Sequence, residues 1–273
     1  MVNVHQIAQV GFGQGTNELY DRARPSYQSS ALSHIRKAVA KPNSLNIVEI
    51  GSGTGIFTRA LLAHPEWTSS IGALTAVEPS AGMREVFAKS ISDQRVSVRE
   101  GAFDRTGEPD GQVDLIVIAQ AFHWCPDYAA AAEEFDRILK PDGIVVLIWN
   151  LEDREAAKWV AQLRDRIEQH EHGTPQFRLG LWRQLFETTA YQDHFSPPEE
   201  ETWSYSLDGS LKIVTDRAFS KSYIAIQPDE VKANIKDDIQ SIVERGEGRR
   251  WIDEAADIFE YPYKTYTVII KRK

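Results

Sequence analysis

Between residues 30 and 150, short runs rich in β-branched residues alternate with helical patterns. This alternation predicts a parallel β-sheet whose strands are joined by crossover helices, which is an α/β fold. The run at 113–120 is almost entirely apolar, as expected for a strand that is buried on both faces. The five predicted strands are residues 45–50, 73–79, 95–101, 113–120 and 144–150.

The regular alternation ends after a longer helix, whose apolar face is predicted from residues 156–167. Residues 173–200 contain Gly, a Pro pair and several aromatic residues, which indicates irregular or short helical structure. Two late strands are predicted at 201–207 and 263–271. Helices at about 210–225 and 228–245 separate them, so we expect these helices to form a cap over the sheet.

The turn GSGTG at residues 51–55 follows the first predicted strand directly and precedes a helix. Glycine permits a sharp turn and a close approach of the backbone to a ligand, and the helix offers free N–H groups. Glu78 ends the second strand, 23 residues after Gly55, close to the spacing of a ribose-binding acid. Together they predict a nucleoside site. Ile56 stands where nicotinamide-binding proteins carry their third glycine, which disfavours an oxidoreductase.

A second glycine pattern, GFGQG at residues 11–15, has no strand before it and no acid at the required distance. A glycine pattern without this strand-turn-helix context is a weak signal. We interpret it as a lead-in to an N-terminal lid.

The composition limits which binding partners and which cellular location we expect. A formal net charge of −9 argues against a broad phosphate-binding face, so we expect a small-molecule substrate, no nucleic acid and no membrane. The single Cys cannot form an intrachain disulfide, and the N-terminus lacks the pattern of a secretory signal. The longest apolar run, residues 144–149, is too short to cross a bilayer. A cytoplasmic protein is predicted, as a monomer or a homodimer.

Several motifs together resemble class I S-adenosylmethionine-dependent methyltransferases. These are EIGSGTG, AVEPS, EGAFD, DLIVIAQAFHW and LKPDGIVVLIWN in the core, with YDRARPSY near the N-terminus and SYIAIQPDE and YPYKTYTVIIKR late in the chain. The resemblance covers roughly residues 15–271. Within that class the pattern is similar to fungal methyltransferases that act on the dithiols of gliotoxin-like metabolites.

This resemblance implies a Rossmann-like class I methyltransferase fold. It has a seven-stranded, mostly parallel sheet flanked by helices, with a helical lid from the N-terminus and from insertions around the sixth strand. The expected divisions of one structural domain are a lid segment at 1–28, a cofactor-binding core at 29–172, and cap helices with the last two strands at 173–273.

The resemblance also implies that the cofactor is S-adenosyl-L-methionine, with S-adenosyl-L-homocysteine as its product. The glycine turn would hold the methionine part, Glu78 the ribose and three residues the adenine, while the N-terminal motif and the end of the fourth strand would complete the site. The implied cofactor-binding residues are Tyr20, Arg24, Tyr27, Gly51, Ser52, Gly53, Gly55, Glu78, Met83, Ala102, Phe103, Gln120 and Ala121.

The stretch AFHWCPD, residues 121–127, places a histidine beside the only cysteine. His123 follows the fourth strand at the expected mouth of the site, so it is the candidate catalytic base. A thiol is already partly ionised near neutral pH, whereas phenols and alcohols need a base more. A carboxylate acceptor would arrive ionised and would require a cationic pocket. Methyl transfer needs no protein nucleophile, so we interpret Cys125 as a small apolar residue in the pocket wall.

Aromatic residues near the predicted carboxyl edge suggest an apolar pocket for a ring-containing substrate. The candidates are Phe122, Trp124, Trp149, Trp182 and Phe186. The histidines do not form a metal-binding pattern, since His170 and His172 cannot share a helical face, so catalysis without a metal is predicted.

The resemblance to gliotoxin-type enzymes makes thiol S-methylation the leading function. Carboxylate or hydroxyl O-methylation is the enzymatic alternative, and a non-catalytic cofactor-binding regulator is the alternative of another class.

Overall fold

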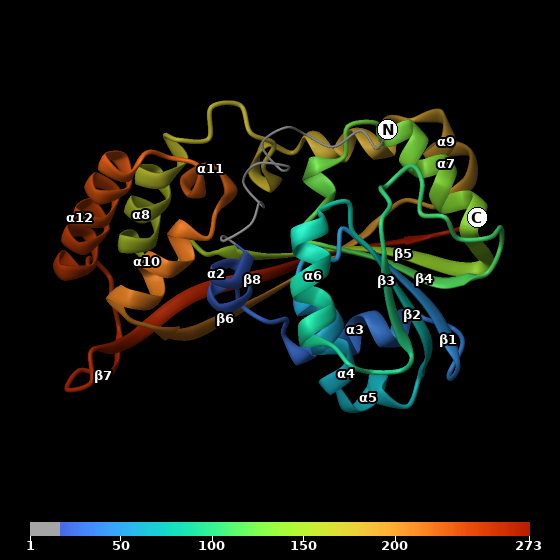
Figure 1. Cartoon of the computed structure of the whole chain (residues 1–273), viewed down its shortest axis with the longest axis horizontal. Helices are drawn as coiled ribbons and strands as arrows, with labels where there is room; N and C mark the ends of the chain where they lie inside the picture. The colour runs from blue at the N-terminus through green and yellow to red at the C-terminus, as the bar shows by residue number, and fades with distance from the viewer. Residues whose placement is uncertain (1–16) are drawn as a thin grey trace.

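The computed structural model describes residues 17–273. Within them, a mixed sheet has seven strands on its main path, in the order β3-β2-β1-β4-β5-β8-β6 (Figure 1). A short strand, β7 (Trp251–Asp253), pairs with β8 off this path. The seven strands are β1 (Leu45–Ile50), β2 (Ile71–Val77), β3 (Val96–Arg99), β4 (Val113–Ala119), β5 (Leu139–Glu152), β6 (Glu199–Gly209) and β8 (Ile258–Lys271).

The strand directions create the edge at which a ligand is expected. Strands β3, β2, β1, β4 and β5 pair in parallel, whereas β8 runs antiparallel to both β5 and β6. The chain order reverses between β1 and β4, and in such sheets ligands bind beyond the carboxyl ends of the strands at this point. The predicted α/β fold with a mostly parallel sheet is confirmed.

The sheet forms in this way because its central strands are apolar on both sides. Every residue of β4 is buried. Ile116 and Ile118 belong to the hydrophobic cluster on one face of the sheet, together with Phe135 of helix α7 (Tyr128–Ile138). Leu115 and Val117 belong to the cluster on the other face. Since successive strand residues point to opposite faces, an all-apolar strand can occupy only the middle of a covered sheet.

Helices cover both faces of the sheet and build the cap. Those of the core are α3 (Ser29–Ala38), α4 (Ile56–Ala63), α5 (Pro65–Thr68), α6 (Ala81–Ser90), α7 (Tyr128–Ile138) and α9 (Thr189–His194), and η1 (Phe122–Trp124), η2 (Phe177–Leu179) and η3 (Leu181–Glu187) are short 3₁₀ turns. Those of the cap are α8 (Lys158–Glu168), α10 (Leu211–Phe219), α11 (Ser222–Ala225) and α12 (Asp229–Arg245).

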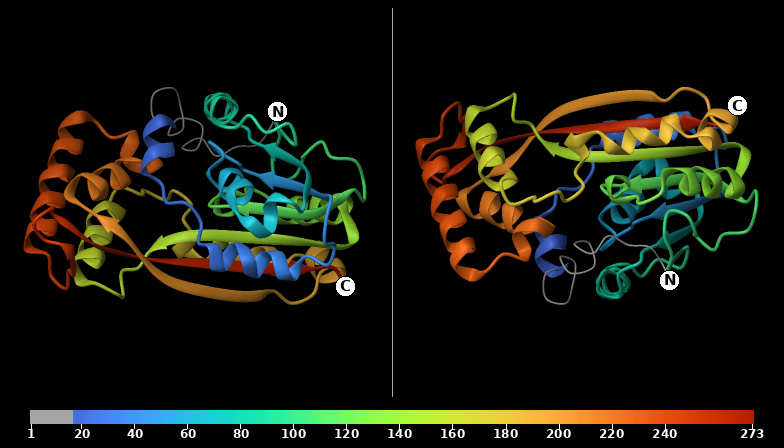
Figure 2. Two further views of the ribbon diagram at one scale, coloured as in Figure 1. Left: turned by 90° about the horizontal axis from the view of Figure 1, so that it is seen from below. Right: turned by 90° about the horizontal axis from the view of Figure 1, so that it is seen from above.

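The cap has a hydrophobic core of its own, in which α8, α10 and α12 pack against the far ends of β6 and β8 (Figure 1, left). Strands β5, β6 and β8 run from the main core into the cap, as both views in Figure 2 show. Helix α2 (Asn17–Ala23) bridges the two parts, since it contacts α10 of the cap and α6 of the core. Asp21 of α2 pairs with Arg59 of α4 at 2.6 Å.

The structure differs from the sequence prediction mainly at strand ends. The fifth strand was predicted to begin at residue 144, but β5 already begins at Leu139, which pairs with Val113 before a register shift. Strand β5 also continues to Glu152, because β8 pairs with it as far as Tyr263. The helix predicted at 210–225 is divided into α10 and α11. The GFGQG pattern and most of the predicted lid segment at 1–28 lie outside the described residues.

Among residues 17–273, no helix combines the length and apolar character that a membrane crossing requires. The domain divisions and the cytoplasmic location predicted from the sequence stay predictions.

Candidate active site

The glycine turn between β1 and α4 has the backbone that only glycine adopts easily. Gly51, Gly53 and Gly55 have positive φ values of 71°, 55° and 86°. The Gly51 N–H donates to Val77 O of β2 at 2.8 Å, which fixes the turn at the end of the sheet. A Cβ added to Gly53 would meet nothing within 4 Å. The turn therefore presents open backbone at the carboxyl edge.

Glu78, directly after β2, is joined to this turn. Its carboxylate accepts the N–H of Gly53 at 2.9 Å and the N–H of Ser80 at 2.8 Å. The side chain is buried, and burial raises its pKa even though both hydrogen bonds favour the charged form. Ser80 caps α6 through the Met83 N–H, as its sequence position predicted. Glu78 thus occupies the position expected of a ribose-binding acid.

The residues around the turn fit S-adenosylmethionine. The hydroxyls of Ser52 and Thr54 are buried and have no hydrogen-bond partner among the described residues, so polar groups remain available beside the turn. Phe103 lies against the turn, 3.8 Å from where a Cβ of Gly51 would be, and packs on Phe122 at 5.7 Å between ring centroids. Met83, in α6, and Ala102, which precedes Phe103 in the chain, are also buried.

Glu49, in β1 two residues before the turn, is a site candidate that the sequence reasoning missed. It is buried, and it accepts a hydrogen bond from the Thr58 hydroxyl. Burial raises its pKa to about 8. A bound cation such as an amino group would favour its charged form. The sequence did carry a signal for Glu49, because it is the acidic residue two positions before the first glycine of EIGSGTG.

The end of β4 lies directly against the glycine turn. A Cβ on Gly51 would come within 2.6 Å of the Ala121 Cβ. Gln120 has a φ of +57°, which is uncommon for a residue with a side chain and concentrates at functional sites. Its amide donates to Asn150 O at the end of β5, at 2.7 Å. The predicted cofactor residues of β1 and β4 are therefore brought together.

His123 lies in η1, which follows β4. Its Nδ1 accepts a hydrogen bond from the indole Nε1 of Trp149, in β5, at 3.2 Å. Burial, together with the nearby Arg24, lowers the pKa of His123 to about 3. Cys125 is buried, its thiol donates to Asp127 O at 3.3 Å, and burial raises its pKa to about 12. The cysteine is therefore a packing residue and not a nucleophile.

A cavity of about 270 Å³ lies between this edge and the cap. Five of the predicted residues line it, namely Tyr20, Arg24, Gln120, His123 and Trp124. The cavity also receives many charged side chains of the cap and of the ends of β5 and β8, which the sequence reasoning missed. These are Glu152, Arg154, Glu155, Arg164, Glu168, Arg178, Arg217, Lys221 and Lys264.

Four of the predicted pocket aromatics do not line this cavity. Phe122, Trp149 and Trp182 are no more than 1% exposed and lie in the core cluster on one face of the sheet, with Phe186 packed against it. The rings of Trp149 and Trp182 are 4.9 Å apart. Their apolar area is used to attach η3 to the sheet, and the apolar pocket predicted from them stays a prediction. Tyr27 likewise packs on Phe57, at 5.0 Å.

The N-terminal motif reaches the cavity from the cap side. The Arg24 guanidinium lies 4.6 Å from the Tyr20 ring centroid, and its Nη2 donates to Ser220 O between α10 and α11 at 2.9 Å. The Asn150 side chain holds the same segment, since its Nδ2 donates to Ser26 O at 3.0 Å. The motif therefore connects the sheet edge to the cap.

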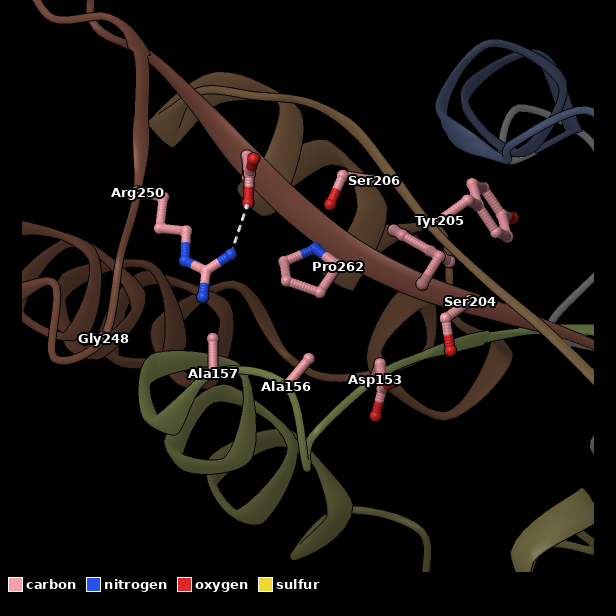
Figure 3. Close-up of a pocket in the computed structure, with 11 residues that line it drawn as sticks. Asp153, Ala156, Ala157, Ser204, Tyr205, Ser206, Gly248, Arg250 and Pro262 are labelled. Atoms are coloured by element: carbon pink, nitrogen blue, oxygen red, sulfur yellow. Dashed lines mark ion pairs between the residues drawn. The ribbon is translucent and has the colours of Figure 1, made fainter.

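A second cavity, of about 460 Å³, is lined by residues that follow β5 and by parts of β6 and β8 (Figure 3). Arg250 at its rim pairs with Glu260 at 4.0 Å and is 79% exposed. The first cavity is lined by Gln120, His123 and Trp124, which follow β4, and the second by none of them, so the second is not the candidate active site.

In the described part of the chain, no group of three or more His, Cys, Asp or Glu side chains is arranged to hold a metal ion. Whether catalysis uses a metal stays a prediction.

The family model described as a methyltransferase domain matches residues 48–147, which run from β1 to β5. The fold is that of class I S-adenosylmethionine-dependent methyltransferases, and the matched segment supports methyltransferase activity.

Two curated relatives extend this result. An uncharacterized methyltransferase-like protein of Schizosaccharomyces pombe is 30% identical over 61% of this chain, and the match spans 62% of that relative. An uncharacterized methyltransferase of Mycobacterium tuberculosis is 29% identical over 82% of each chain. The fold is similar to that of an inferred methyltransferase from an antibiotic biosynthesis pathway of Anabaena variabilis, with a TM-score of 0.58 and 19% identity, over 87% of this chain and 96% of that one.

Proposed function

We propose that this enzyme methylates a small molecule at an atom that enters the site already ionised, most simply the thiolate of a thiol or dithiol. In the transfer, the acceptor's lone pair forms the new bond to the methyl carbon, while the carbon–sulfur bond electrons return to sulfur and give S-adenosylhomocysteine. An ionised acceptor releases no proton in this step. The cavity volume and the net charge of −9 support a small molecule over a nucleic acid.

The contact between Trp149 and His123 carries this proposal. An indole nitrogen can only donate, so the imidazole nitrogen that faces it is the acceptor. The ring is neutral because its pKa is about 3, and its single proton is therefore on the other nitrogen. His123 thus offers an N–H donor at the cavity, which argues against the general-base role predicted from the sequence. Phenols and alcohols, which need a base, fit this site less well.

Two acceptor classes remain. The resemblance to gliotoxin-type enzymes supports a thiol or dithiol. A specific observation supports a carboxylate as the second candidate, because basic side chains line the cavity. Neither class requires a protein base.

Substitution of His123 by alanine is expected to lower kcat only about 3–10-fold, the effect of losing one hydrogen bond of ~0.5–1.5 kcal/mol. The shape of the kcat/KM profile between pH 5.5 and 8 should not change, since the His123 pKa lies below this range. His123→Gln, which can still donate, should recover part of the loss. A loss of 10²-fold or more in His123→Ala, with an acidic limb that disappears, would instead identify a general base.

The function itself is tested in two steps. Calorimetry is expected to detect binding of S-adenosylhomocysteine and no binding of NADH. The enzyme is then incubated with S-adenosylmethionine and a panel of thiols, carboxylic acids and phenols, and mass spectrometry records the gain of one methyl group. Parallel reactions that contain S-adenosylhomocysteine in place of the methyl donor are the control. Methylation confined to phenols would contradict the proposal.

A further inference from the structure

The candidate cavity has an excess of positive charge, although the chain as a whole is acidic. Its lining contains seven basic side chains and three carboxylates, in a protein with a net charge of −9. The basic residues are Arg24, Arg154, Arg164, Arg178, Arg217, Lys221 and Lys264, and the acids are Glu152, Glu155 and Glu168. The excess is therefore local to the cavity.

Most of these charges are already paired. Glu152 accepts from Arg164 at 2.7 Å and from Lys221 at 2.8 Å. Glu168 pairs with Arg164, and also with Arg154 and Arg178 at 3.5 and 3.4 Å. Lys264 pairs with Glu155 at 2.9 Å. Within residues 17–273, no carboxylate forms an ion pair with the remaining two, Arg24 and Arg217.

Arg217, on α10, is the more deeply placed of these two. It is 2% exposed, its Nε donates to the Tyr263 hydroxyl at 3.0 Å, and its Nη1 has no partner in the described residues. The hydroxyl of Tyr223 is also buried and has no partner there. Burial disfavours the Arg217 charge, but Tyr263 and Glu152 favour it and raise the pKa of Arg217. Its Nη1 and the Tyr223 hydroxyl remain buried donors that an anion from outside the chain can use.

Arg24 lies close enough to be affected by the charge of Arg217. Burial and then the Arg217 charge lower the Arg24 pKa to about 10. The Arg24 Nε has no partner in residues 17–273. An anion bound between the two guanidinium groups would reduce their repulsion, and a guanidinium binds a carboxylate through two parallel hydrogen bonds.

The same cavity is also lined by Gln120 and His123, which lie on either side of Ala121, the residue that lies against Gly51 of the glycine turn. A molecule held at Arg217 therefore reaches the cofactor side. The volume of about 270 Å³ is close to the lower end of the ~300–1,000 Å³ of typical ligand pockets, which suits a small metabolite.

From these observations we propose that Arg217 and the Tyr223 hydroxyl, with Arg24 beside them, bind a carboxylate of the methyl acceptor, so that the substrate is a small organic acid. The inference rests on the proposed methyltransferase function and names the substrate class of that site. It holds whether the methyl group goes to a second carboxylate or to a thiol on the same acid.

The test uses the full-length enzyme saturated with S-adenosylhomocysteine. Calorimetry compares linear dicarboxylates from malonate to adipate, and 3-mercaptopropionate, with the methyl ester of each. At least one acid is expected to bind at least tenfold more tightly than its ester. Acids and esters that bind equally, or a complete absence of acid binding, would overturn the inference. If S-adenosylhomocysteine itself does not bind, the proposed function fails first, and the inference fails with it.

Variants separate this role from a structural one. Arg217→Gln and Tyr223→Phe should weaken acid binding at least tenfold and leave the affinity for S-adenosylhomocysteine within twofold, while Arg217→Lys retains part of the acid binding. Arg154→Gln is the matched control, since Arg154 lines the cavity but is already paired with Asp165 and Glu168. It should leave acid binding within twofold.

A readout without any ligand completes the test. The urea midpoint of the free enzyme is compared between Arg217→Gln and the unchanged enzyme, because loss of an arginine that is only structural would lower the midpoint without changing acid binding. A lower midpoint together with unchanged acid binding would show that Arg217 is structural. A change confined to the affinity for S-adenosylhomocysteine would assign Arg217 to the cofactor, and the inference would be wrong.

Discussion

Substitution of Glu152 by glutamine is expected to lower the free energy of unfolding by about 3–5 kcal/mol, a large part of the ~5–15 kcal/mol that stabilises a typical domain. Glu152 ends β5 and is buried. It accepts hydrogen bonds from Arg164 of α8, from Lys221 between α10 and α11, and from the Tyr261 hydroxyl of β8 at 2.6 Å. A single carboxylate thus joins β5, α8, β8 and the segment between α10 and α11.

The electrostatic reason is the loss of the negative charge that the cluster shares. Burial opposes ionisation of Glu152, but Lys221 and Arg164 hold its pKa well below the usual range. Glutamine preserves the shape, but it leaves Lys221 without its counter-ion and Arg164 with Glu168 alone, which is the costly way to break a buried ion pair.

Urea denaturation followed by circular dichroism measures the effect of Glu152→Gln. Glu155→Gln is the matched control, because Glu155 is 81% exposed and its pair with Lys264 is a surface ion pair worth about 0–1 kcal/mol. Equal losses in the two variants would show that the buried cluster contributes no more than a surface pair.

The second large effect is expected at Glu78, where glutamine should weaken the binding of S-adenosylhomocysteine about 100-fold. Each oxygen of the carboxylate already accepts one backbone N–H, from Gly53 and from Ser80. A glutamine must turn its NH₂ group toward one of these donors, which loses that bond and moves the turn. It also replaces a charged acceptor for the ribose hydroxyls, and such hydrogen bonds contribute about 1.5–3 kcal/mol.

Calorimetry of Glu78→Gln checks this expectation. Glu100→Gln is the control, since Glu100 is 62% exposed and pairs with Arg84, which itself donates to Glu78 O. Its affinity should stay within twofold of the original enzyme. Unchanged binding in Glu78→Gln would remove Glu78 from the cofactor site.

The core of the fold could be predicted because its signals are local. The run at 45–50 became β1 with the predicted bounds, since a buried parallel strand is rich in apolar residues and the glycine turn marks its end. The ends of β5 could not be predicted in the same way. Its extension to Glu152 depends on pairing with β8, more than a hundred residues later, and not on the residues around it.

The residues of the candidate site also differ in whether local sequence predicts their position. Gly51, Gly53 and Glu78 form a motif with fixed spacing, so the sequence predicted their position at one edge. Glu152 and Arg217 come from distant elements, and a charged residue in a helical pattern looks the same whether it faces solvent or a cavity. Glu152 alone had a signal, as an acid at the carboxyl end of a predicted strand.

The surroundings of the aromatic residues could not be predicted from the sequence either. Trp149 and Trp182 were predicted as pocket residues because of their size and position, but both are buried in the core. Aromatic content indicates that apolar area will be buried, and the partner that buries it depends on which face of the sheet each ring occupies.

The unbroken course of β5, β6 and β8 from core to cap has a consequence for the energetics of turnover. A cap attached by a flexible linker would lose conformational entropy each time it closed on a ligand, and this loss would weaken binding. Here the wall that carries Arg217 is attached to continuous strands, so its ordering takes place once, when the chain folds. The acceptor then meets a preformed wall, and the affinity gained from each contact is not reduced by ordering the cap.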